Sequence, residues 1–95
     1  MLLAIDIGNT NIVLGVSDGT TWRYHFRIET RTGKMPDEYM LTFKGLFDHA
    51  GNTLERIDRI VLSSVVPTLT WTIEEALTRL LDAPIIHVSP SVKLS

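Results

Sequence analysis

The 95-residue chain contains no cysteine, no excess of basic residues and no long apolar run. The absence of cysteine excludes disulfides and thiolate metal ligands, and it is compatible with a reducing cytoplasm. A net charge of −2 gives no electrostatic footprint for a nucleic acid or an acidic membrane as a partner. No segment approaches the length of a membrane span, and the N-terminus lacks the features of a secretory signal. We therefore expect one soluble cytoplasmic domain with a single core.

What the chain does contain is a charge at the end of an apolar segment. Residues 2–5 are apolar at every position, which predicts a strand covered on both faces. Asp6 follows directly and belongs to the same side of that strand as Leu2 and Ala4. An unpaired carboxylate is costly in such a place, so Asp6 is the first candidate functional residue.

A turn follows Asp6 almost at once. Gly8 tolerates backbone angles closed to other residues, and the side chains of Asn9, Thr10 and Asn11 bond readily to nearby backbone groups. We interpret the segment as a tight hairpin whose tip directs several hydrogen-bond donors at one small volume beside a carboxylate. That arrangement suits a nucleotide phosphate accompanied by Mg²⁺. The alternative is an ordinary β-turn in which Asp6 bonds only to turn amides.

Two further strands are predicted before the first helix. Residues 12–16 are apolar on both faces, and the Asp-Gly pair that follows them is a hairpin signal. Residues 22–29 alternate between large apolar and charged or polar side chains, which predicts one buried and one wet face and places this strand at a sheet edge. The simplest role for Arg23 and Arg27 on the solvated face is to keep the edge strand from pairing with another chain. Contact with a partner chain or a phosphate is the alternative.

Two helices and two strands complete the predicted fold. Pro36 is followed by two acidic residues and begins a helix that ends at Gly51-Asn52. Residues 60–66 are apolar on both faces and rich in β-branched side chains, as in a central parallel strand. A second helix begins at Pro67, and residues 85–88 form the fifth strand. The order β-β-β-α-β-α-β predicts an α/β fold, a mixed five-stranded sheet with flanking helices.

Several polar residues have two interpretations. Ser63 and Ser64 stand at the end of a central strand, where they either flank Asp6 at a ligand site or simply relieve crowding. Arg31, Lys34 and Glu38 lie near the start of the first helix. For these three residues the mouth of a cleft and a plain solvated surface are equally consistent with the sequence.

Three segments, taken in order, resemble a single family. Residues 3–11 are similar to the phosphate-binding motif of type III pantothenate kinases, residues 37–39 to their acidic-aromatic helix start, and residues 63–67 to their fourth-strand signature. These enzymes belong to the acetate and sugar kinase, Hsp70 and actin superfamily. The resemblance covers essentially the whole chain and implies a ribonuclease-H-like domain of the actin-like ATPase type. Residues 1–95 would form a single N-terminal subdomain, with the second domain of the parent enzyme absent.

The resemblance also implies an activity. It is the transfer of the ATP γ-phosphate to the primary hydroxyl of pantothenate, the first step of coenzyme A biosynthesis. By the same match, Asp6 is the catalytic and metal-binding residue and acts on Mg²⁺ through bound water. Gly8, Asn9, Thr10 and Asn11 would bind the ATP phosphates. A monovalent cation (K⁺ or NH₄⁺), a homodimer of the complete enzyme and a cytoplasmic location are implied as well, with no nucleic acid or membrane as partner.

The end of the sequence sets a limit on this interpretation. Residues 89–95 resemble the Gly-Pro-Gly-Val-Lys-Thr-Gly loop of the family but depart from it at Ser89, Ser91, Leu94 and Ser95. The family's Gly-x-Asp-Arg motif, which carries the catalytic base, is expected beyond residue 95. We therefore expect this chain to be a fragment or a truncated product that alone neither binds ATP tightly nor turns over.

Two functions from other classes are alternatives. A ribonuclease-H-type nuclease shares the order of elements and the first-strand aspartate, but it requires further carboxylates near Asp6 to hold two metal ions. A non-catalytic accessory or regulatory protein with a kinase-like fold is the other alternative. The intact hairpin after Asp6 favours retained nucleotide chemistry in the parent protein.

Overall fold

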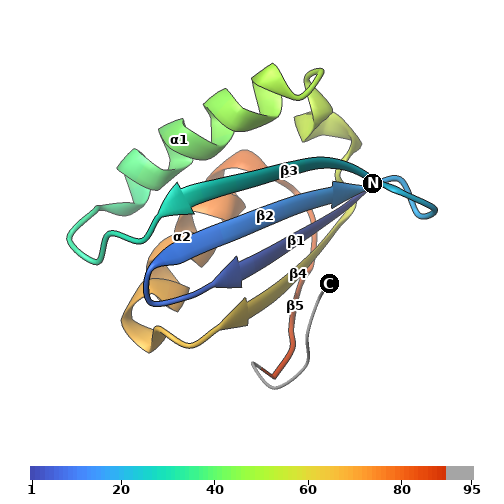
Figure 1. Cartoon of the computed structure of the whole chain (residues 1–95). Helices are drawn as coiled ribbons and strands as arrows, with labels where there is room; N and C mark the ends of the chain where they lie inside the picture. Colours follow the sequence, from blue (N-terminus) through green and yellow to red (C-terminus); the bar gives the residue numbers. More distant parts are fainter. Residues whose placement is uncertain (90–95) are drawn as a thin grey trace.

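The computed structural model describes residues 1–89 and contains the predicted order of elements (Figure 1). A short 3₁₀ helix that the sequence did not predict joins the first helix to the fourth strand. The predicted likeness of the tail to a glycine-rich loop falls on residues 90–95, which lie outside the described residues. The strands are β1 (Leu2–Ile7), β2 (Asn11–Ser17), β3 (Trp22–Glu29), β4 (Arg59–Ser64) and β5 (Ile85–His87), and the helices are α1 (Pro36–His49), η1 (Thr53–Arg56) and α2 (Pro67–Leu80).

The five strands form one mixed sheet in the order β3-β2-β1-β4-β5. β1 pairs antiparallel with β2 and parallel with β4, so it lies at the centre, and β3 lies at an edge as its alternating pattern predicts. The register places Asp6 opposite Val13 on β2 and opposite Ser63 on β4. The carboxyl ends of β1, β4 and β5 therefore meet at one edge of the sheet, where open α/β sheets bind ligands.

The core lies on a single face of the sheet. Residues of both helices join one buried cluster with alternate residues of the strands, and α1 and α2 contact each other. The largest fully buried side chains include Tyr39, Phe43 and Phe47 of α1 and Leu69 and Ile73 of α2. In Figure 1 the two helices accordingly form a second layer against the sheet.

The prediction that β1 is covered on both faces is wrong for the described part of the chain. Leu3, Ile5 and Ile7 point into the core and are fully buried, whereas Asp6 on the opposite face is exposed. No helix in residues 1–89 covers that second face, which we call the open face. The small side chain of Ala4 is shielded there because neighbouring strands crowd it, so a run that is apolar on both faces does not require two covering layers.

The helices begin and end where the local sequence predicts. Pro36 and Pro67 are the first residues of α1 and α2, where the missing N–H removes no helical hydrogen bond. After α1, Gly51 and Asn52 adopt left-handed φ angles of 68° and 54°, which end the helix and turn the chain. No helix in residues 1–89 combines the length and the apolar character that crossing a bilayer requires.

Candidate phosphate-binding site

Asp6 is an exposed carboxylate near the carboxyl end of the central strand. It lies on the open face, and its side chain makes no hydrogen bond or ion pair within residues 1–89. The burial cost that first singled it out is therefore absent. The alternative of an ordinary turn predicted bonds from turn amides to this carboxylate, and the described part of the chain shows none. The oxygens of Asp6 are thus available to a ligand.

The turn after Asp6 is closed by backbone contacts. The Gly8 N–H donates to the Asn11 carbonyl at 2.9 Å, and a Cβ at Gly8 would lie 3.0 Å from that same oxygen. Glycine is the residue that permits such a close approach. Asn9 and Thr10 at the tip are exposed, and neither their side chains nor their backbone N–H groups bond to any described residue. The tip therefore presents unused donors on the same edge as Asp6.

The loop between β3 and α1 supports this turn from one side. Thr30 donates from its N–H to the Thr10 carbonyl at 2.9 Å and from its hydroxyl to the Gly8 carbonyl at 2.7 Å. The fully buried Tyr39 fixes the next residue, since its hydroxyl accepts from the Arg31 N–H and donates to the Arg31 carbonyl. Sequence reasoning missed Thr30 and Tyr39 as supports. The pairing of β3 with β2 is the signal that places Thr30 beside the turn.

A shallow depression that is widely open to solvent lies beside this loop. Its lining includes Arg31, Lys34 and Glu38. The sequence was equally consistent with a cleft mouth and with a plain surface for these three residues. Lys34 Nζ lies 5.3 Å from the centroid of the Tyr39 ring, and Arg31 pairs with Glu29 at 3.3 Å. The depression is therefore polar and carries both signs of charge. Its lining residues are Glu29, Thr30, Arg31, Thr32, Gly33, Lys34 and Glu38.

The two serines of β4 have different surroundings. Ser63 is opposite Asp6 in the register, because the fourth strand pairs with the first. Ser64 is opposite Ile7, and its hydroxyl accepts from the Val66 N–H at 3.0 Å just before α2 begins. Ser64 thus supports the strand-to-helix connection, whereas Ser63 is the serine adjacent to the candidate site.

The donor set around Asp6 fits one kind of metal. Among residues 1–89, no group of three or more His, Cys, Asp or Glu side chains lies close enough to hold a metal ion. Zn²⁺ or Ca²⁺ sites draw most ligands from the protein, but Mg²⁺ keeps several waters and uses one or two carboxylates together with substrate phosphates. One exposed carboxylate beside a turn with unused N–H donors therefore fits Mg²⁺ bound with a nucleotide.

Comparison with known proteins decides the family. The family model described as type III pantothenate kinase matches residues 2–95. The chain belongs to the type III pantothenate kinase family. Type III pantothenate kinases from a Geobacillus species and from Moorella thermoacetica are 43% and 44% identical to it over 93 residues. The aligned region is 98% of this chain but only 36% and 37% of those relatives, so the chain spans little more than a third of their length.

A solved structure supports the fold of this chain. The ROK hexokinase from Thermus thermophilus superposes with a TM-score of 0.66 at 18% sequence identity, covering 93% of this chain and 33% of the hexokinase. At that identity the likeness concerns the fold alone. It confirms the predicted α/β fold, a mixed five-stranded sheet of the actin-like ATPase type.

Proposed function

We propose that this chain is the N-terminal, phosphate- and magnesium-binding part of a kinase that transfers the ATP γ-phosphate to pantothenate. The observation that carries the proposal is the site at the carboxyl end of β1. There an exposed carboxylate, Asp6, lies next to a turn whose tip has unused N–H donors, in a chain of the type III pantothenate kinase family.

The geometry supports a division of work among these residues. Phosphoryl transfer depends mostly on positioning and on stabilising charge, so the protein has little covalent chemistry to perform. Asp6 would orient Mg²⁺ through bound water, and Asn9, Thr10 and Asn11 would hold phosphate oxygens. Gly8 already donates its N–H to Asn11, so its part in the proposal is to close the turn tightly. Mg²⁺ supplies charge neutralisation on the phosphates when it is bound.

The remaining parts of the reaction belong to the complete protein. Because the chain spans little more than a third of its relatives, pantothenate binding, the monovalent cation, the catalytic base and a homodimer are all proposals for that protein. A cytoplasmic location is proposed with them. The nuclease alternative has less support, since the residues opposite Asp6 on the neighbouring strands are Val13 and Ser63, and neither is a carboxylate.

The first test is the effect of Asp6→Asn on nucleotide binding. In the amide NMR spectrum of the isotope-labelled chain, MgATP should shift the signals of Asn9, Thr10 and Asn11. Asp6→Asn should weaken MgATP binding by roughly ten-fold without weakening the binding of metal-free ATP, because it removes the metal-facing charge. Asp82→Asn, an exposed aspartate without a partner in the described residues, is the matched control.

Turnover is tested in a chimera. The 93 aligned residues of this chain replace the matching third of the Geobacillus relative, and pantothenate phosphorylation is followed through ADP release. The chimera should turn over and the isolated chain should not. Asp6→Asn should lower kcat of the chimera by about 100-fold or more, in line with loss of a group that stabilises transition-state charge. Full turnover of the Asp6→Asn chimera would show that the metal site is assigned to the wrong residue.

A further inference from the structure

The register of the sheet places an arginine in the same row as Asp6. Asp6 on β1 is opposite Val13 on β2, and Val13 is opposite Arg27 on β3. Directly paired residues point to the same face, so Arg27 shares the open face with Asp6. With neighbouring strands about 4.8 Å apart, the Cα atoms of Arg27 and Asp6 are separated by roughly 10 Å. The side chain of Arg27 is long enough to span much of that distance.

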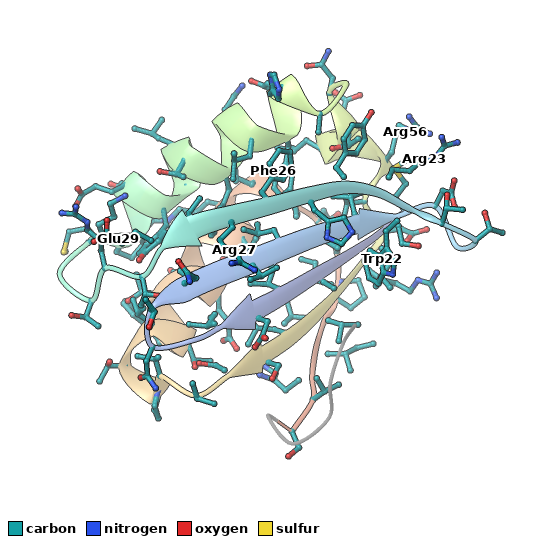
Figure 2. The ribbon with its side chains drawn as sticks, viewed as in Figure 1. Trp22, Arg23, Phe26, Arg27, Glu29 and Arg56 are labelled. Atoms are coloured by element: carbon teal, nitrogen blue, oxygen red, sulfur yellow. The ribbon has the colours of Figure 1, made fainter. Side chains whose placement is uncertain are left out.

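Arg27 differs from most arginines in residues 1–89 because its guanidinium has no carboxylate partner there. Arg23 of the same strand pairs with Asp18 at 2.7 Å, and Arg31, Arg59 and Arg79 also take part in ion pairs. Arg27 is exposed and makes no hydrogen bond or ion pair with a described residue, including Asp6. Figure 2 shows Arg27 along the middle of the sheet and Arg23 at the end of β3 far from Glu29.

The row thus carries an unpaired cation and an unpaired anion on either side of an apolar residue. Val13 between them is half-buried and has no polar side-chain group to offer a ligand. A guanidinium forms two parallel hydrogen bonds with phosphate oxygens and stays charged at all relevant pH values. A carboxylate binds the same ligand through a divalent cation. A metal-bound polyphosphate is the class of ligand that satisfies both ends of such a row at once.

We propose that Arg27 is a second phosphate-contacting residue of this site. It holds the polyphosphate of the nucleotide on the open face while Asp6 faces the metal, an assignment that rests on the proposed function. The alternative is that Arg27 is only a charged surface residue that protects the edge strand from pairing with another chain, in which case it binds no ligand. Arg23 fits that protective role better, because Asp18 already holds its guanidinium near the start of β3.

The experiment titrates the isotope-labelled full chain with Mg²⁺-tripolyphosphate, MgATP and pantothenate in separate series. Arg27→Gln should weaken binding of both polyphosphates about ten-fold, judged from the shifts of Asn9 and Thr10, because it removes charge-assisted hydrogen bonds. Arg27→Lys should lose part of that affinity. Arg23→Gln, the matched change on the same strand, should stay within about two-fold of the unchanged chain. Unchanged amide dispersion verifies that each variant is folded.

Each contrary result has a distinct meaning. If the turn amides respond to MgATP but Arg27→Gln binds as tightly as the unchanged chain, the role of Arg27 is refuted and the proposed function stands. If MgATP and tripolyphosphate leave the turn amides of the unchanged chain unmoved, both are refuted for this chain. If the Arg27 side-chain signal responds to pantothenate and not to tripolyphosphate, Arg27 binds the carboxylate of pantothenate. The assignment of Arg27 to phosphate binding is then overturned.

Discussion

At the scale of single residues, the two aspartates near hairpin tips have opposite surroundings. Asp6 has no partner in the described residues, whereas Asp18 is held by many. The Asp18 carboxylate accepts from the backbone N–H groups of Thr21 and Thr20, from the Thr20 hydroxyl and from Arg23 Nε. These hydrogen bonds, with the backbone bond from Thr21 foremost, hold the pKa of Asp18 well below its usual range. A saturated carboxylate of this kind organises a turn, while an unsaturated one is free for a ligand.

This environment predicts a pH-dependent contribution of Asp18 to stability. Its folded pKa lies below the unfolded value of about 4, so the contribution is present at neutral pH and is lost as the pH falls below about 4. Asp18→Asn should therefore lower the urea midpoint at pH 7, and the difference from the unchanged chain should shrink on acidification. Equilibrium urea unfolding across that pH range measures both effects. Asp82→Asn should alter neither, and a constant Asp18→Asn difference at all pH values would contradict the electrostatic explanation.

At the scale of elements, Tyr39 connects helix α1 to the loop that supports the turn after Asp6. Its hydroxyl bonds to the Arg31 N–H at 3.0 Å and to the Arg31 carbonyl at 2.8 Å. Tyr39→Phe keeps the buried ring and removes both bonds, so we expect a loss of about 1–2 kcal/mol in the free energy of unfolding. Hydrogen exchange of the Arg31 and Thr30 amides should also become faster, because the loop is released from the helix.

The control for this change is another tyrosine. Tyr24 on β3 is half-buried, and its hydroxyl makes no hydrogen bond with a described residue. Tyr24→Phe should therefore change the free energy of unfolding by less than about 0.5 kcal/mol. Equal losses in the two variants, measured by urea unfolding, would show that the Tyr39 hydroxyl does not fix the loop.

Helices and strands were predictable where the residues within them mark their start or their exposed face. Pro36 and Pro67 begin the helices because a ring without an N–H is tolerated there, and the alternation of residues 22–29 marks β3 as an edge strand. Of the candidate site, the sequence predicted Asp6 and the turn, because glycine and asparagine signal turns locally. The supporting contacts of Thr30 and Tyr39 were not predicted, since they depend on the register of β3 against β2 and on the position of α1, which the hairpin signal alone does not determine.

At the scale of the whole molecule, the feature that local patterns could not predict is the open face. Ile5 and Ala4 are neighbours on β1, yet Ile5 belongs to the core cluster, whereas Ala4 is buried on the open face without a helix of residues 1–89 above it. Trp22 covers Gly15 in a similar way, since a Cβ at Gly15 would lie 3.0 Å from its ring. Within residues 1–89, small residues and one aromatic ring thus reduce exposure without a second layer, and Asp6 and Arg27 remain accessible.

This asymmetry predicts unequal costs for adjacent truncations on β4. Leu62 points into the core and is 1% exposed, whereas Val61 is half-buried on the open face. Leu62→Ala should lower the free energy of unfolding by about 2–5 kcal/mol, because it leaves a cavity between sheet and helices. Val61→Ala should lower it by about 1 kcal/mol or less, because solvent fills the space. Urea unfolding at several protein concentrations measures both. A loss for Val61→Ala as large as that for Leu62→Ala would contradict the open face, and a loss that grew with protein concentration would identify a second copy as its cover.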